Sequence, residues 1–272
     1  MIGALIIVFR EVIEAGLIIG IVLAATRTVA GSRLWISYGV LGGLVGSCIV
    51  AAFTGSIAQL FDGYGQELFN GIILAVAVLM LAWHNIWMAV HGRQMAGDLK
   101  QTGTEVREGR RTLAALAIVV GAAVLREGSE VVLFLYGVLV GGGGTVASIA
   151  IGGFIGLGIG AVMSALTYLG LLKIPTRHIF KVTTWLITIL AAGMAAQSVS
   201  YFEKAGVIEI LSTTVWDTSS LLSESSVFGL MLHTLIGYSD QPTLLQLLAY
   251  LATIALIVAA TRFASMPKQV AA

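Results

Sequence analysis

Residues 4–26 read ALIIVFREVIEAGLIIGIVLAAT, an apolar segment that is interrupted by Arg10, Glu11 and Glu14. A helix that crosses about 30 Å of hydrocarbon needs about 20 mostly apolar residues, and this segment is long enough. Ionisable residues inside such a helix are costly, and by default they mark the pathway of an ion or a substrate. The segment therefore predicts a transmembrane helix that carries three charged side chains into the membrane for a functional reason.

The composition of the whole chain indicates a membrane protein. Of its 272 residues, 58% are hydrophobic and 11% are charged, whereas soluble domains are about 45–50% apolar and about 25% charged. A chain so poor in charge cannot cover a water-facing surface, which excludes a soluble enzyme. Its net charge of +1 provides no basic surface for a nucleic acid, and its single cysteine, Cys48, excludes a disulfide framework. We therefore expect an all-α, polytopic integral membrane protein surrounded by lipid.

Hydropathy predicts seven transmembrane helices in a single transmembrane domain that covers residues 1–272. The expected ranges are 4–26, 35–60, 68–91, 113–140, 146–172, 180–201 and 243–263. Two longer segments lie between them, a mixed-charge cytoplasmic connector at 92–112 and an outer segment at 202–242. The outer segment is neither highly charged nor of low complexity, so we expect short helices or a re-entrant piece that lies over the bundle.

Basic residues fall almost entirely on one side of this arrangement. With seven crossings, the loops after the first, third and fifth spans face the same side as the C-terminal tail. These segments contain Arg27, Arg33, Arg93, Lys100, Arg107, Arg110, Arg111, Lys173, Arg177, Lys181, Arg262 and Lys268. The opposite loops contain Lys204 as their only basic residue. Because cytoplasmic loops are enriched in lysine and arginine, we expect the N-terminus outside and the C-terminus in the cytoplasm.

The charged string of the first span occurs a second time in the fourth. Arg10-Glu11-Val12-Ile13-Glu14 matches Arg126-Glu127-Gly128-Ser129-Glu130 at an offset of 116 residues. Three glycines of the second span also match the fifth span at an offset of 110: Gly42, Gly43 and Gly46 against Gly152, Gly153 and Gly156. Residues 1–91 and 113–201 are therefore expected to be two copies of a three-helix unit. Because each copy crosses an odd number of times, the two are inverted, as in transporters whose binding site lies near the midplane.

Small residues recur every four positions in the second and fifth spans. They are Gly39, Gly43 and Ser47 in the second span, and Gly152, Gly156, Gly160 and Ser164 in the fifth. Ridges of small residues let helix backbones approach closely in lipid. We interpret them as packing surfaces that bring the charged helices together.

Each charged string places its ionisable side chains on one arc of its helix, because residues three and four apart are neighbours. Each arginine is then within reach of the second glutamate of its string. Together the strings supply four carboxylates and two guanidinium groups, which have a formal charge of −2 when all are ionised. A divalent cation would neutralise this charge. Carboxylate oxygens suit hard or borderline cations. The expected metal ligands are Glu11, Glu14, Glu127 and Glu130, supported by Arg10 and Arg126. The alternative, two purely structural Arg–Glu pairs, leaves the excess of carboxylates unexplained.

The paired Arg-Glu-x-x-Glu strings, in the first and fourth of seven spans, resemble the oxidase-dependent iron permease family. The segment LSTTVWDTSSLLSE at 211–224, with Gly237-Tyr238 and Pro242, is similar to the bacterial, EfeU-type branch of that family. The resemblance covers essentially the whole chain. It implies high-affinity iron uptake across a bacterial cytoplasmic (inner) membrane, with iron as the transported substrate, no cofactor, and both strings needed for iron passage.

The resemblance also bears on partners. Some bacterial members of the family carry a large outer domain before the first span, and the first span of this chain starts near residue 4. We therefore expect any ferroxidase, peroxidase or iron-delivery activity to come from a separate protein.

Other polar residues are weaker candidates for an ion pathway. Those within the spans are His84, His91 and Gln197, and those in the outer loops are Asp62, Glu67 and Asp217. The first group also fits ordinary interhelical hydrogen bonding. The second group would attract cations but also fits a solvated loop.

Two alternative functions follow from the same residues. Carboxylates alone do not separate iron from lead, manganese or zinc, so a permease for another divalent cation stays open. A membrane di-iron oxidoreductase is less favoured, because di-iron carboxylate bundles use Glu-x-x-His pairs and both strings here end in glutamate. We expect a transporter and not an enzyme.

Overall fold

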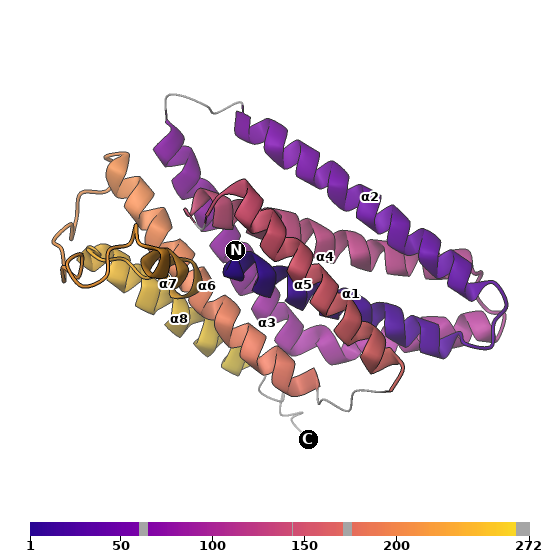
Figure 1. Cartoon of the computed structure of the whole chain (residues 1–272). Helices are drawn as coiled ribbons and strands as arrows, with labels where there is room; N and C mark the ends of the chain where they lie inside the picture. Colours follow the sequence, from indigo (N-terminus) through magenta and orange to yellow (C-terminus); the bar gives the residue numbers. More distant parts are fainter. Residues whose placement is uncertain (60–64, 143, 171–175, 265–272) are drawn as a thin grey trace, which may run out of the picture. The chain divides into compact units, whose positions relative to one another are not determined.

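The structure is a computed structural model that describes residues 1–59, 65–142, 144–170 and 176–264 (Figure 1). Within these ranges the chain is helical, apart from connecting segments and one isolated bridge between Thr214 and Thr243. The helices are α1 (Ile2–Ala25), α2 (Ser32–Gln59), α3 (Gln66–Arg107), α4 (Ala114–Val140), α5 (Val146–Tyr168), α6 (Thr176–Lys204), α7 (Val227–Ile236) and α8 (Leu244–Ala264).

Five of these helices are long and apolar enough to cross a membrane. The stretches that qualify are Ser32–Thr54, Gln66–Met88, Val146–Tyr168, Val182–Lys204 and Leu244–Ala264. α1 and α4 have 24 and 27 residues, but each carries three charged side chains in the middle of its apolar sequence. The chain is therefore a multi-pass membrane protein. Each of the seven expected ranges falls on one helix, α1–α6 or α8, and that all seven cross the membrane stays a prediction.

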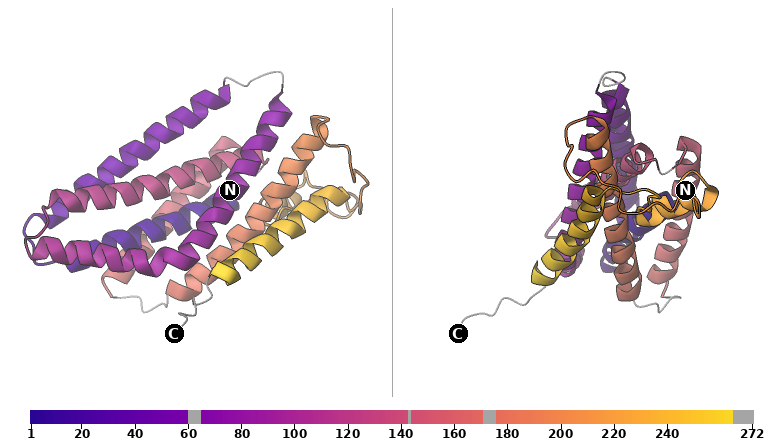
Figure 2. Two further views of the ribbon diagram at one scale, coloured as in Figure 1. Left: turned by 180° about the vertical axis from the view of Figure 1, so that it is seen from behind. Right: turned by 90° about the vertical axis from the view of Figure 1, so that its left-hand side faces the viewer.

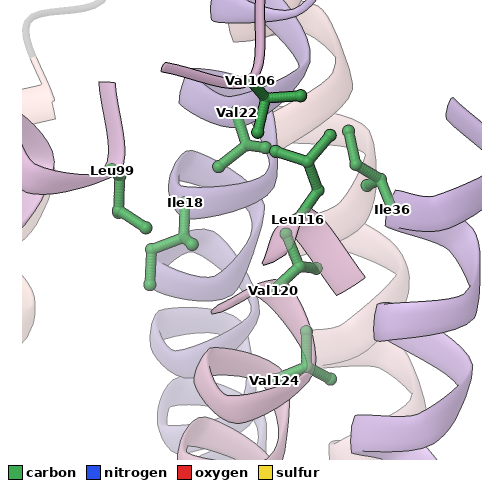
Figure 3. Close-up of a cluster of buried hydrophobic side chains, with 8 residues drawn as sticks. All are labelled: Ile18, Val22, Ile36, Leu99, Val106, Leu116, Val120 and Val124. Atoms are coloured by element: carbon green, nitrogen blue, oxygen red, sulfur yellow. The ribbon is translucent and has the colours of Figure 1, made fainter. Parts of the chain in front are cut away.

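The chain folds as two compact units. The first consists of residues Met1–Asp62, Gln94–Leu139 and Thr145–Thr183, and it contains α1, α2, α4 and α5 with the end of α3 and the start of α6. Its apolar core gathers residues from four helices (Figure 3). They are Ile18, Val22, Ile36, Leu99, Val106, Leu116, Val120 and Val124. The core thus joins the two charged helices, α1 and α4, to α2 and to the end of α3.

α3 is longer than the sequence pattern predicts. The expected span ends at residue 91, but the helix continues to Arg107 through most of the segment expected to be a connector. Leu99 and Val106 of this extension are each 6% exposed and belong to the core of the first unit. The mixed charges of 98–111 predict a connector. Most of the segment is instead the end of a helix with one buried face, on which Leu99 and Val106 lie seven positions apart.

α2 packs against α4 through its small residues, and the two helices run in the same direction (Figures 1 and 2). A Cβ atom on Gly39 would lie 2.6 Å from the carbonyl oxygen of Ala117. One turn further along both helices, a Cβ atom on Gly43 would lie 2.8 Å from the carbonyl oxygen of Gly121. Side chains larger than hydrogen at these two positions would force the helices apart.

α1 packs against α5 in the same way. A Cβ atom on Gly152 would collide with the carbonyl oxygen of Met1, and one on Gly156 would lie 2.5 Å from that of Leu5. The contacts again advance together along both helices, so α1 and α5 are parallel. The small-residue ridges of the second and fifth spans therefore bring each of these helices against one of the two charged helices.

The second unit consists of residues Gly63–Arg93, Val140–Gly144 and Thr184–Ala272. Within it, the Ser198 hydroxyl of α6 donates a hydrogen bond of 2.7 Å to the carbonyl oxygen of Gly71 in α3. α7 begins after Ser226, whose side chain accepts a hydrogen bond of 3.0 Å from Gly229 N–H. It ends at Ile236 and is capped by Gly237, whose φ of +68° is a left-handed conformation that favours glycine.

The outer segment is folded rather than extended. Its backbone is closed by hydrogen bonds from Val215 N–H to the Pro242 carbonyl and from Thr218 N–H to the Asp240 carbonyl, both 2.9 Å. It contains one short helix, α7, and that the segment lies over the bundle on the outer side stays a prediction. The chain turns back on itself between Thr214 and Thr243, and these two residues form an isolated antiparallel bridge.

Candidate metal site

Three carboxylates of the first unit converge inside the protein. Glu11 of α1 and Glu127 and Glu130 of α4 each offer one oxygen atom, and these atoms lie within 4.8 Å of one another. Glu11 and Glu127 are 1% and 2% exposed. Ionised carboxylates at such short separation repel one another strongly in a poorly polarisable interior. The arrangement is therefore suited to hold a cation, or protons, between its oxygens.

Each arginine forms the contact that the spacing of its string predicts. Arg10 Nε lies 3.0 Å from Glu14 Oε1, and Arg126 Nε lies 3.0 Å from Glu130 Oε1, both at i,i+4. Arg10 Nη1 also lies 3.2 Å from Glu11 Oε1. Each guanidinium group thus offsets part of the negative charge of its own string and orients a carboxylate.

The two strings contribute unequally to the convergence. Both glutamates of α4 offer oxygens to it, whereas α1 contributes Glu11. Glu14 is 3% exposed and is held by Arg10 on the same helix. Of the four expected ligands, the structure brings three together and places the fourth one turn away in an ion pair.

The weaker pathway candidates differ in their exposure. His84 is buried in α3 at 2% exposure, whereas His91 is exposed and stacks on Trp87 with ring centroids 5.2 Å apart. Glu67 is exposed at the start of α3. Asp62 lies outside the described residues.

Asp217 is an exposed residue of the outer segment and serves a structural purpose there. It accepts hydrogen bonds from the Ser219 hydroxyl (2.6 Å), the Ser219 backbone N–H (3.0 Å) and the Gln241 amide (2.9 Å). These bonds hold the pKa of Asp217 below its ordinary value, the Ser219 hydroxyl contributing most. The carboxylate therefore stays ionised and ties two parts of the segment together.

The sequence pattern assigns no role to His233. In the structure, its ring contacts residues from separate segments of the second unit. Its Nδ1 lies 2.8 Å from the Tyr238 carbonyl and 3.0 Å from Glu224 Oε1. Its Nε2 lies 3.1 Å from the Gly141 carbonyl and also contacts Gln197. Gly141 is 92 residues away in the chain, so no local sequence signal could have identified this histidine.

His233 also lines a polar cavity of about 630 Å³ in the second unit. Other lining residues are Gln197, Tyr201, Lys204, Glu224 and Asp240. The expected pathway residue Gln197 is therefore at a polar surface and in contact with a histidine, which fits both of the interpretations that its sequence position allowed.

An all-helical, multi-pass chain with carboxylates converging inside its helices has the features of a membrane ion transporter. The chain belongs to the iron permease FTR1 family, which it matches over residues 1–266. Members of this family are permeases, so the chain is a transporter and not an enzyme.

Among its relatives are proteins named ferrous iron permease EfeU. The one from Escherichia coli O6:H1 is 31% identical over 242 residues, which cover 87% of this chain and 86% of the relative. The one from Escherichia coli O157:H7 is 30% identical over 266 residues, covering 96% and 95% of the two chains. The one from Yersinia pestis is 31% identical over 249 residues, covering 90% and 87%. No solved structure matches the chain significantly.

Proposed function

We propose that this chain imports iron across a bacterial cytoplasmic membrane through a site formed by Glu11, Glu127 and Glu130, with Glu14 as a contributing carboxylate. The observation that carries the proposal is the convergence of carboxylate oxygens from α1 and α4 within 4.8 Å. Family membership and the names of the relatives support iron as the substrate.

The charge of the site favours a divalent ion. Four carboxylates and two guanidinium groups have a formal charge of −2 when all are ionised, and a ferrous ion makes the site neutral. The name shared by the relatives specifies ferrous iron. Because oxygen ligands also suit manganese and zinc, site geometry must contribute to any selectivity.

The proposed architecture has seven membrane crossings and two inverted repeats, residues 1–91 and 113–201. Alternate crossing requires α1 to be parallel to α5 and α2 to α4, which agrees with their contacts. The backbone groups of α4 that face Gly43 and those of α1 that face Gly156 are at equivalent positions, since their residue numbers differ by 116, the offset of the two strings. They are Gly121 O and Leu125 N opposite Gly43, and Leu5 O and Phe9 N opposite Gly156.

In the proposed mechanism, an iron ion from the outer side reaches the carboxylates and displaces protons from them. Rocking of one repeat against the other then exposes the ion to the cytoplasm, as in other inverted-repeat transporters.

The test is uptake of radioactive iron by proteoliposomes that contain the purified protein, with ferrous and ferric iron supplied separately. Glu11→Gln, Glu127→Gln and the double variant Glu14→Gln/Glu130→Gln are expected to abolish uptake. The control is Glu209→Gln, which changes an exposed carboxylate of the outer segment. Normal uptake by Glu11→Gln and Glu127→Gln would refute the site.

The same vesicles test the alternative substrates. Manganese, zinc and lead are added as competitors at increasing concentration, and each is then supplied alone as a radioactive ion. Transport of one of these ions in preference to iron would replace iron as the substrate and leave the carboxylate site in place.

A further inference from the structure

The residue that directly follows the first glutamate of each string faces a small residue of another helix. In α1 this residue is Val12, which faces Gly160 of α5. In α4 it is Gly128, which faces Ser47 of α2. The strings differ at this position, with valine in α1 and glycine in α4. The helix opposite has the smaller residue, glycine, where the string has valine, and the larger residue, serine, where the string has glycine.

The space in each contact is fully used. A Cβ atom on Gly160 would lie 2.9 Å from Val12 Cγ1 and 3.0 Å from Val12 Cβ. A Cβ atom on Gly128 would lie 2.8 Å from Ser47 Cβ and would collide with Ser47 Oγ. Carbon atoms in contact are normally about 3.5–4.0 Å apart. One added methyl group would therefore displace a helix, or the side chain opposite, by about 1 Å.

We propose that Val12–Gly160 and Gly128–Ser47 are matched packing pairs that fix the separation of Glu11 from Glu127 and Glu130, and so determine which cation the site accepts. The inference rests on the function proposed above for these carboxylates. The four residues are positioning residues, because they act on the cation through the glutamates.

The link between packing and binding is short. Val12 is bonded to Glu11 and Gly128 is bonded to Glu127, so a displaced helix backbone carries the adjacent carboxylate with it. Binding sites lose performance when their ligands move by more than about 0.5 Å, and metal–oxygen distances are fixed within about 0.2 Å. A shift of about 1 Å at one pair is therefore large for a metal site.

The first experiment exchanges the volumes of the α2–α4 pair. Gly128→Ala, Ser47→Gly and the double variant Gly128→Ala/Ser47→Gly are compared in proteoliposomes for ferrous iron KM, maximal rate and inhibition by manganese and zinc. We expect Gly128→Ala to raise KM at least about tenfold and to change the ratio of manganese to zinc inhibition. Ser47→Gly removes the atoms that would collide, so the double variant should return to within about twofold of the unaltered protein.

The second experiment gives the α1–α5 pair the residues of the other pair. Gly160→Ser alone places a side chain against Val12 and is expected to impair uptake as Gly128→Ala does. Val12→Gly/Gly160→Ser reproduces the glycine–serine combination that already fits between α4 and α2. It relieves the contacts with Val12 but leaves the Cβ atom 3.1 Å from the carbonyl oxygen of Phe9, so it should recover part of the lost iron affinity.

The matched control is Gly158→Ala, on the same helix as Gly160. A Cβ atom on Gly158 would meet no atom within 4 Å, so this variant tests the effect of replacing a glycine in α5 by itself. It should leave KM and the inhibition ratio unchanged.

The inference is overturned if Gly128→Ala leaves KM and the inhibition ratio unchanged, or if both double variants are as impaired as their single variants. If Gly128→Ala does not accumulate in the membrane, recovery of accumulation and uptake by Ser47→Gly supports the inference, and no recovery overturns it. Failure of the proposed function is distinguishable, since it would appear as normal uptake by Glu11→Gln.

Discussion

Arg10 and Glu14 form an ion pair that is almost completely shielded, with Nε 3.0 Å from Oε1 and both side chains 2% exposed. The corresponding pair in α4, Arg126 and Glu130, has the same 3.0 Å distance, but its side chains are 33% and 13% exposed. The two strings are therefore alike in spacing and different in environment. This difference separates the expected effects of otherwise equivalent substitutions.

Replacing Arg10 should cost more stability than replacing Arg126. Arg10→Gln leaves Glu11 and Glu14 buried without their guanidinium partner, and breaking a buried pair costs about 3–5 kcal/mol. Arg126→Gln breaks a pair whose side chains are less deeply buried, 33% and 13% exposed, so it should cost less than Arg10→Gln. Thermal unfolding of the purified variants in detergent measures both, and equal losses would contradict the environments described above.

Glu11 and Glu14 should respond differently to the same change. Glu11→Gln removes one ionised carboxylate from the group formed with Glu127 and Glu130. It should lower uptake, measured as kcat/KM, at least about 100-fold. Glu14→Gln acts through Arg10 and should lower it by about tenfold or less. Initial rates of iron uptake at several iron concentrations give these values. An effect of Glu14→Gln as large as that of Glu11→Gln would place Glu14 among the direct ligands.

His233→Ala should loosen the outer segment. The change removes the ring that lies against the carbonyl groups of Gly141 and Tyr238, and a hydrogen bond lost there costs about 1 kcal/mol. Limited proteolysis should then cut residues 205–243 faster, while His91→Ala, at an exposed position, should leave the rate unchanged. Equal cleavage rates in His233→Ala and the unaltered protein would show that other contacts hold the segment.

The contribution of Asp217 should depend on pH. Its pKa is lowered in the folded protein from the ordinary value of 3.8 by its bonds to Ser219 and Gln241. A depressed folded-state pKa stabilises the protein above the unfolded pKa, and this stabilisation is lost as the pH falls through the folded value. Asp217→Asn should therefore accelerate proteolysis of the segment at pH 7 more than at acid pH. A larger difference at acid pH would contradict the assigned hydrogen bonds.

The class of the protein and the positions of its helices could be predicted from the sequence because lipid imposes strong constraints. A spanning segment must satisfy its backbone internally and must be long and apolar, so hydropathy located α1–α6 and α8 to within a few residues, apart from the extension of α3. The spacing of each string likewise predicts the contacts Arg10–Glu14 and Arg126–Glu130, which are local to one helix turn.

The sequence by itself thus determined the membrane class, the helical segments, the two charged strings and the resemblance to a permease family. The tertiary structure decided that Glu11 meets Glu127 and Glu130, that Val12 faces Gly160 and Gly128 faces Ser47, and that His233 meets Gly141. All these contacts join residues far apart in the chain. Their geometry depends on how side-chain volumes fit between helices, and no local pattern of the sequence encodes that fit.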